Sequence, residues 1–386
     1  MVPLVQPKAI QSERTRASFM HRLEQALGLR DRYGMTFNFS LTARIFKSQF
    51  PDVFALILRR KAFINLLILK LHNASKCNYV TAYPYFLTVE PGNVCMLKCP
   101  LCPTGQGRKE LPKGFLSYSD FQKILDEMGE YLYRLDLSNW GEPLLNHDIF
   151  KMILYARKKK IFVTLSSNLN YFNKDICRKL VTSGLNLLKF SLYGASQETI
   201  ETYQRGGRFE KVIRNVKLIV KERKRRKSKK PFLQWRFMIT KHNEHQLSRA
   251  RQIAEDLGID YVEFGSICCD MAREIFLDHE SQFENVKPLL PSNPAYSCYD
   301  YSRKRLKTQN NGCSLLWNSA VVNWDGSVFP CCKVFEKKWN FGNAFKNGFM
   351  KIWNNSKYRA ARESVAVGKD SQPITVCHIC RLRARF

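Results

Sequence analysis

The sequence predicts an α/β protein whose centre is a parallel β-sheet. Short apolar runs alternate with helical stretches from residue 86 onward, and a cysteine-bearing segment follows them. Strands that alternate with helices pair in parallel, because each helix carries the chain back to the same edge of the sheet. The six predicted strands lie at 86–90, 135–138, 162–166, 187–192, 233–239 and 261–264. Ligands of such sheets bind where the strands end, at the carboxyl edge.

Residues 1–85 are predicted to form a helical N-terminal extension. One of its helices is expected to begin at Pro51, a residue suited to a first helical turn, and to end near Leu71. The basic residues 59–61 divide its apolar runs, which are shorter than the ~20 residues that a bilayer span needs. Two interpretations stay open: the helix packs on the main domain, or it lies as a basic helix on a membrane surface.

Two segments follow the predicted strands. Residues 271–310 lack a clear period and contain three prolines, which indicates a linker between the main domain at 86–270 and the tail. Residues 311–386 are predicted to form a small cysteine-rich domain. Within it, Asp325-Gly326 separates two short β-prone runs, which is a strong signal for a β-hairpin.

Composition narrows the function classes and the compartment. The 386 residues carry a net charge of +30, which favours acidic partners or substrates. The basic run 221–230 is interpreted as the solvated end of a helix, so nucleic acid is not the expected partner. The number of cysteines, 13, is odd, and no secretory signal precedes them. Both observations predict a cytoplasmic protein whose cysteines bind metal or do chemistry. Peripheral contact with a membrane stays open.

The first cysteine cluster follows the first predicted strand. Cys95, Cys99 and Cys102 stand at C-x3-C-x2-C spacing, and three closely spaced thiolates in one loop suit a soft metal centre. A [4Fe–4S] cluster held by three cysteines keeps one iron open for a small chelating molecule. The alternative is a zinc site whose fourth ligand lies elsewhere in the chain.

The segment from Val94 to Pro103 resembles the cysteine signature of the radical S-adenosylmethionine (SAM) enzymes, with Leu101 where many members carry an aromatic residue. The resemblance covers roughly 86–270 and implies a partial (β/α)6 barrel, a [4Fe–4S] cluster held by the three cysteines, and SAM bound to its open iron. Short polar motifs after the second, third and fourth strands match segments that bind SAM in this family. The SAM-binding residues that the resemblance implies are Gly141, Glu142, Pro143, Ser166, Asn168, Ser191 and Arg205.

The same resemblance implies a reaction class. One electron, from a reductase such as flavodoxin or ferredoxin, would pass through the cluster and break a bond of SAM. The resulting 5′-deoxyadenosyl radical takes hydrogen from an unactivated carbon of the substrate. Oxidation, epimerisation and other radical outcomes stay open, as do sugar or aminocyclitol, lipid-linked and peptide substrates.

The second cysteine cluster lies in the tail. Cys313, Cys331, Cys377 and Cys380 supply four thiolates, which suit either a closed zinc site or a fully ligated iron–sulfur cluster. The stretch from Cys313 to Cys332 resembles the SPASM/Twitch extension of radical SAM enzymes, which implies one auxiliary [4Fe–4S] cluster on these four cysteines. Cys332 is the rival of Cys331 as a ligand.

Two hypotheses complete the sequence-based interpretation. Cys268 and Cys269 follow the sixth predicted strand, where a thiol would be able to return hydrogen to a substrate radical; the alternative is a packed or merely exposed thiol. The alternative to the enzyme as a whole is a metal-stabilised, strongly basic nucleic-acid-binding protein without SAM chemistry.

Overall fold

The computed structural model describes residues 59–109, 111–267, 279–307, 313–368 and 371–380. The chain divides into two compact units, 1–51 and 52–386, and every described residue belongs to the second. The first part of the helix predicted from Pro51, and both Cys268 and Cys269, lie outside the described residues.

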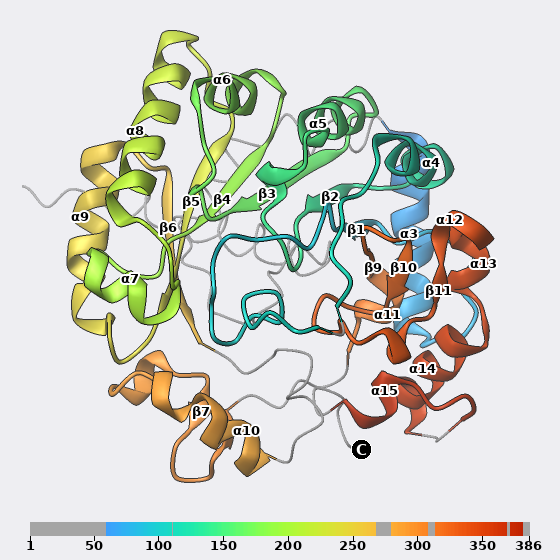
Figure 1. Cartoon of the computed structure of the whole chain (residues 1–386). Helices are drawn as coiled ribbons and strands as arrows, with labels where there is room; N and C mark the ends of the chain where they lie inside the picture. The colour runs from blue at the N-terminus through green and yellow to red at the C-terminus, as the bar shows by residue number, and fades with distance from the viewer. Residues whose placement is uncertain (1–58, 110, 268–278, 308–312, 369–370, 381–386) are drawn as a thin grey trace, which may run out of the picture. The chain divides into compact units, whose positions relative to one another are not determined.

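Six parallel strands form the main part of the sheet, in sequence order from β1 to β6 (Figure 1). Each lies within about two residues of a predicted strand, so the predicted α/β fold with a parallel sheet is confirmed. The strands are β1 (Phe86–Val89), β2 (Arg134–Leu137), β3 (Phe162–Ser167), β4 (Leu187–Ser191), β5 (Phe232–Ile239) and β6 (Tyr261–Ser266).

Helices cover the outer face of this curved sheet (Figure 1). They are α4 (Tyr118–Met128), α5 (Ile149–Lys158), α6 (Lys174–Thr182), α7 (Gln197–Tyr203), α8 (Phe209–Arg225) and α9 (Leu247–Leu257). The helical stretch is interrupted between α7 and α8 at Gly206, which adopts a φ of +83°. Leu135 and Leu137 point toward the helices and are fully buried, whereas Asp136 between them faces the inner side and is half-buried.

The C-terminal segment extends the same sheet. β9 (Ser319–Val322) pairs in parallel with β1, and β10 (Ser327–Phe329) pairs antiparallel with β9, which confirms the hairpin predicted at Asp325-Gly326. β11 (Gly342–Asn343) is the edge strand. Short helices follow: α11 (Leu315–Asn318), α12 (Ala344–Asn347), α13 (Phe349–Trp353), α14 (Ser356–Val367) and α15 (Val376–Ile379). The cysteine-rich tail is therefore joined to the barrel through β1.

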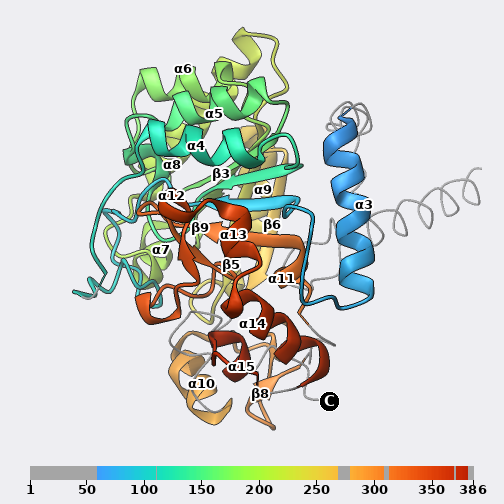
Figure 2. The same ribbon diagram turned by 90° about the vertical axis from the view of Figure 1, so that its right-hand side faces the viewer.

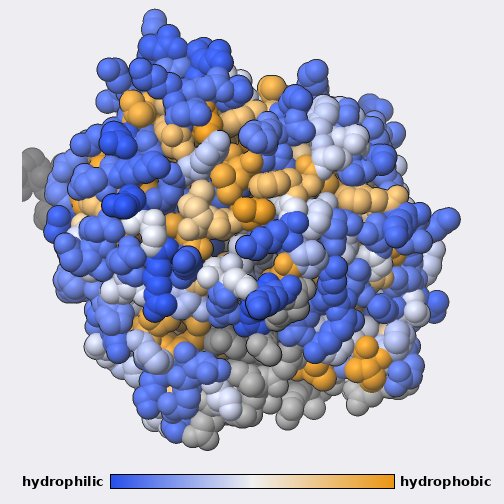
Figure 3. All heavy atoms as spheres, in the orientation of Figure 1, coloured by the Kyte–Doolittle hydropathy of each residue, from blue (hydrophilic) through white to orange (hydrophobic). Residues whose placement is uncertain are grey.

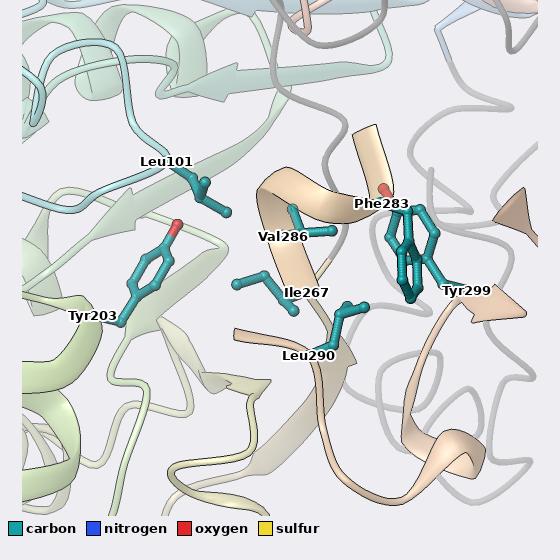
Figure 4. Close-up of a cluster of buried hydrophobic side chains, with 7 residues drawn as sticks. All are labelled: Leu101, Tyr203, Ile267, Phe283, Val286, Leu290 and Tyr299. Carbon is teal, nitrogen blue, oxygen red and sulfur yellow. The ribbon is translucent and has the colours of Figure 1, made fainter. Parts of the chain in front are cut away.

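The segment that was expected to be a linker, 271–310, contains regular structure in its described part. α10 (His279–Val286) precedes a two-stranded hairpin of β7 (Tyr299–Asp300) and β8 (Arg305–Leu306). Their buried side chains pack on the cysteine loop after β1 and on the end of α7 (Figure 4). The cluster consists of Leu101, Tyr203, Ile267, Phe283, Val286, Leu290 and Tyr299. The domain boundaries stay a prediction.

The described part of the N-terminal extension contains α3 (Arg60–Ala74) (Figure 2). Arg59 fixes its start by donating hydrogen bonds to the carbonyl oxygens of Leu132 (2.7 Å) and Gly129 (2.8 Å), just before β2. α3 therefore lies beside the amino-terminal ends of the strands. Its outward side carries an apolar stripe of Ile64, Leu67 and Leu71, which are 55%, 49% and 69% exposed. Within the described residues, no helix combines the length and apolar character needed to cross a bilayer.

Candidate active site

The loop after β1 brings three cysteines together. The backbone N–H of Cys102 donates to the carbonyl of Cys99 (3.2 Å), which closes a tight turn, and the N–H of Leu97 donates to the Sγ of Cys95 (3.4 Å). Burial raises the pKa of Cys95 to about 11, and burial together with the two neighbouring thiols raises the pKa of Cys99. Burial also raises the pKa of Cys102. The three thiols thus share one largely buried space.

This donor set fits an iron–sulfur cluster. Buried thiolates are unstable without positive charge beside them, and metal coordination supplies that charge. Among the described residues, no three His, Cys, Asp or Glu side chains converge as tightly as a single metal ion requires. Zinc holds each sulfur at ~2.3 Å from one centre, whereas a cubane presents its irons at separate corners. Three thiolates from one loop therefore suit a cluster whose fourth iron takes another ligand.

Gly141 and Glu142 attach the end of β2 to the cysteine loop. A Cβ at Gly141 would lie 2.1 Å from the carbonyl oxygen of Gly92, so only glycine fits there. The next residue donates its backbone N–H to the carbonyl of Val94 (2.8 Å). These two contacts set the distance between the end of β2 and the residue before Cys95.

The side chain of Glu142 then attaches the end of β3. Its carboxylate accepts hydrogen bonds from the Oγ of Ser167 (2.8 Å) and from the backbone N–H groups of Asn168 (2.8 Å) and Leu144 (3.1 Å). Burial raises the pKa of Glu142 to about 7, while these donors act against the shift. The side-chain amide of Asn168 reaches the Sγ of Cys95 at 3.6 Å. Three loops that are distant in sequence therefore meet at the first cysteine cluster.

The other predicted SAM-binding residues lie around the same edge. Ser166 and Ser191 are half-buried at the ends of β3 and β4, and Pro143 begins a buried short turn beside Glu142. Arg205 has an exposed side chain, and its carbonyl accepts the N–H of Lys98 (3.0 Å) from within the cysteine loop. The role of these residues as SAM ligands stays a prediction.

Sequence reasoning missed Gln204, which is 3% exposed. Its amide donates to the carbonyl of Ser191 (3.0 Å), and its carbonyl oxygen accepts the N–H of Tyr193 (2.7 Å). It therefore fixes the end of β4 against the loop that carries Arg205. In the sequence, only its position next to Arg205 indicated that Gln204 belongs to the site.

Sequence reasoning also missed Glu90, which directly follows β1 and is 1% exposed. Its carboxylate accepts the backbone N–H of Trp140 (3.1 Å) and is hydrogen-bonded by the backbone of Trp324 in the β9–β10 turn. Asn139 contacts the same turn, donating to the Oδ1 of Asn323 (3.1 Å). Glu90 therefore joins the rim of the barrel to the tail. In the sequence, only its position as a single acidic residue at the end of a predicted strand indicated that Glu90 has a role at the site.

We predict that Glu90 makes stability depend on pH. Burial raises the pKa of Glu90 to about 7, against 4.5 for an ordinary glutamate. The folded protein thus keeps a proton that the unfolded chain releases, so stability falls as pH rises from about 4.5 to about 7, by at most about 3 kcal/mol. Urea unfolding of the anaerobic protein at pH 5 and pH 8 measures this loss.

The matched comparison uses a neutral side chain of the same shape. Glu90→Gln should show a smaller loss of stability between the two pH values than the wild type. Glu255→Gln, at an exposed position of α9, should follow the wild type at both. Equal pH dependence in the wild type and Glu90→Gln would refute the prediction.

The second cysteine set is also brought together. The pKa of Cys377 is raised mainly by burial and further by Cys380, Cys313 and Cys331, and the pKa of Cys331 is raised by burial and then by Cys332, Cys380 and Cys313. Four buried thiols that influence one another suit a cluster in the same way as the first set. Cys331 is among the thiols that raise the pKa of Cys377, and the choice between Cys331 and Cys332 as the ligand stays a prediction.

Backbone N–H groups support these thiols. Cys313 accepts hydrogen bonds from the backbone of Leu315 and Leu316, and Cys331 accepts one from Lys333. Such donors stabilise thiolate charge and tune bound clusters. At the C-terminal pair, Thr375 and His378 form a capping box that begins α15, where Cys377 lies.

Comparisons with known proteins agree with these two centres. Residues 89–230 match the family model of the radical SAM superfamily, and residues 313–381 match that of SPASM, an iron–sulfur cluster-binding domain. The chain is 24% identical over 300 residues to the tungsten-containing aldehyde ferredoxin oxidoreductase cofactor-modifying protein of Pyrococcus furiosus, covering 71% of this chain and 82% of that protein. It is 25% identical over 338 residues to the AdoMet-dependent heme synthase of Methanosarcina barkeri, covering 79% of this chain and 93% of that protein.

A solved structure shows the same fold. SuiB of Streptococcus suis, bound to its precursor peptide SuiA, matches with a TM-score of 0.54 and 15% sequence identity. The match covers 92% of this chain and 80% of SuiB.

Proposed function

Because this chain belongs to the radical SAM superfamily and carries a SPASM domain, we propose that it cleaves SAM reductively and removes hydrogen from an unactivated carbon of its substrate. The protein is an enzyme whose cofactors are SAM, a [4Fe–4S] cluster and an auxiliary iron–sulfur cluster. The observation that carries the proposal is the meeting of Cys95, Cys99 and Cys102 with the ends of β2 and β3 at the carboxyl edge of the sheet. A basic nucleic-acid-binding protein without SAM chemistry does not account for this arrangement.

The chain's own residues have distinct proposed roles. Cys95, Cys99 and Cys102 would hold the first cluster, which supplies the electron that breaks SAM to give a 5′-deoxyadenosyl radical. The backbone at Gly141 and Pro143 and the side chains of Ser166, Asn168, Ser191 and Arg205 would orient SAM. The carboxylate of Glu142 accepts hydrogen bonds within the protein, so we propose that Glu142 serves the SAM site by positioning the rim.

The tail would hold the auxiliary cluster on Cys313, Cys331, Cys377 and Cys380. The hairpin turn beside Glu90 places the tail at the rim of the barrel. We propose that substrate binds at this rim, beside the first cysteine set.

The substrate is proposed only at the level of chemical classes. The heme synthase of M. barkeri is named for a tetrapyrrole product, and SuiB binds a precursor peptide, so related enzymes take both small molecules and peptides. We propose an organic substrate with an unactivated C–H bond, from the sugar or aminocyclitol, lipid-linked or peptide classes. Cys268 and Cys269, as donors that return hydrogen to the substrate radical, are part of the same proposal.

Electrons are proposed to come from a reductase of the flavodoxin or ferredoxin type. Hydrophilic side chains cover much of the face drawn in Figure 3, with hydrophobic ones gathered in a band across its middle. The net charge of +30 makes an acidic electron carrier the complementary partner.

Deuterium transfer tests the proposed function. The reconstituted, reduced enzyme is incubated with SAM and with candidate substrates deuterated at carbon, and 5′-deoxyadenosine is analysed by mass spectrometry. Deuterium in 5′-deoxyadenosine is expected with the true substrate, and its position identifies the carbon attacked. A protein that forms no 5′-deoxyadenosine under reducing conditions, with its iron in place, would refute the proposal.

We further predict peripheral membrane contact through α3. Replacing Ile64, Leu67 and Leu71 together by glutamine should abolish flotation of the protein with anionic vesicles, because the exposed apolar stripe beside basic residues is what a membrane surface binds. Flotation on sucrose gradients with anionic and neutral vesicles measures binding.

The control places one polar group elsewhere: Leu154→Gln, at an exposed position of α5, should float like the wild type. Failure of the wild type to bind anionic vesicles would refute membrane contact. α3 lies at the amino-terminal ends of the strands, opposite the cysteine loop (Figure 2). This contact would therefore hold the enzyme at a membrane without placing the carboxyl edge of the sheet against the bilayer.

A further inference from the structure

A fully buried arginine lies within the tail. Arg362, on α14, is 0% exposed, and its Nε donates to the carbonyl of Leu316 (3.0 Å). Its Nη1 donates to the carbonyl of Asn78 (3.0 Å), and its guanidinium lies 4.4 Å from the ring centroid of Trp353. All of these partners are electrically neutral.

No carboxylate among the described residues balances the charge of Arg362. Arg362 forms no ion pair with a carboxylate in the part of the chain that the structure describes, and its Nη2 is buried there without a hydrogen-bond partner. Burial lowers the pKa of Arg362 to about 9, so the group is still charged at neutral pH. A buried charge without a counter-ion costs several kcal/mol, which indicates that a negative group belongs nearby.

Two neighbours of this arginine, Leu316 and Tyr358, are also neighbours of the second cysteine set. Leu316 accepts the hydrogen bond of Arg362 through its carbonyl and donates one to Cys313 through its N–H. Tyr358, whose ring centroid lies 5.2 Å from the guanidinium, is close enough to Cys331 and Cys377 for both to raise its pKa. Arg362 is therefore linked to Cys313 by hydrogen bonds through Leu316, and it shares Tyr358 as a neighbour with Cys331 and Cys377.

We propose that Arg362 is a positioning residue of the auxiliary iron–sulfur centre, supplying its buried positive counter-charge and holding the turn that presents Cys313. Four thiolates give such a centre net negative charge, and a nearby cation makes its reduction easier. Arg362 therefore raises the reduction potential of the centre. The inference rests on the auxiliary cluster of the proposed function, but not on SAM cleavage or on the substrate.

The test measures that potential directly. In a chain carrying C95A, C99A and C102A, the auxiliary centre is the only one expected, so redox titration followed by electron paramagnetic resonance reports on it alone. Arg362→Met removes the charge and keeps an unbranched, though shorter, side chain, and it should shift the midpoint potential to more negative values. Arg362→Lys keeps the charge and should stay close to the parent.

Arg134→Met is the matched control. Arg134 also packs on aromatic rings, with its guanidinium 5.3 Å from Phe86 and 6.0 Å from Phe162, but it lies on β2, which β1 separates from β9 of the tail. Its removal should leave the potential unchanged.

Several outcomes decide the matter. Loss of the auxiliary irons in Arg362→Met but not in Arg362→Lys would support the proposal, because the charge is then what the centre requires. An unchanged potential in Arg362→Met, equal effects of both substitutions, or a parent chain that binds no iron would each overturn it. The last outcome would also refute the auxiliary cluster, whereas the first two would leave the proposed function intact.

Discussion

Replacing Cys95, Cys99 and Cys102 together by alanine is expected to abolish formation of 5′-deoxyadenosine and to lower the iron content from about eight to about four per chain. The three thiols face one shared space in a single loop, and the tail's cysteines are mutually grouped elsewhere. Removing the first set therefore removes one centre and leaves the other. Iron and sulfide analysis of anaerobically reconstituted protein, with chromatography of the SAM products, measures both effects.

Cys177→Ala provides the control. This cysteine is buried on α6, and it should be replaceable without loss of iron or of SAM cleavage. A triple variant that still forms 5′-deoxyadenosine would show that the SAM-cleaving centre lies elsewhere in the chain.

Replacing Gly141 by alanine is expected to weaken SAM binding by at least about tenfold, which corresponds to about 1.4 kcal/mol. The added Cβ would lie 2.1 Å from the carbonyl oxygen of Gly92 and 2.9 Å from the Cα of Asn93. Both atoms belong to the backbone at the start of the cysteine loop, so no flexible side chain can move aside. Overpacking of this kind costs ~1–3 kcal/mol, and here the strain displaces the loop that carries the cluster. Anaerobic titration with SAM measures the affinity.

Gly107→Ala is the control that separates the effect of local backbone strain on SAM affinity from the effect of displacing the cysteine loop. Gly107 lies in the same loop region with a φ of +64°, but an added Cβ meets no atom within 4 Å. Alanine there costs ~1–2 kcal/mol of backbone strain and should leave SAM affinity unchanged. Equal SAM affinity in Gly141→Ala and the wild type would contradict the structure at this contact.

The sequence predicts the barrel strands well because each carries its own local signal. Val163, Leu165 and Leu188 belong to apolar runs of strand length, and buried parallel strands need such runs. The hairpin at Asp325-Gly326 follows from turn chemistry alone. The spacing of Cys95, Cys99 and Cys102 likewise indicates their common role, because one short loop holds all three.

Features that depend on distant pairing were not predictable in this way. Residues 319–322 read as a strand, but no local pattern states that they pair with β1, more than 200 residues earlier. The prolines near residue 290 suggest a linker, whereas Phe283 and Tyr299 find buried partners only once the chain is folded. Glu142 was identified as a site residue, yet its hydrogen bonds to β3 are a property of the assembled rim.

The pairing of β1 with β9 bears on biosynthesis. Until residues 319–322 have been synthesised, β1 has β2 on one side and bare N–H and C=O groups on the other. The strand that leads into the first cysteine loop therefore gains its second neighbour only after the tail has been synthesised. We expect iron loading to follow synthesis of the tail, and a protein truncated before residue 311 to aggregate through this uncovered edge.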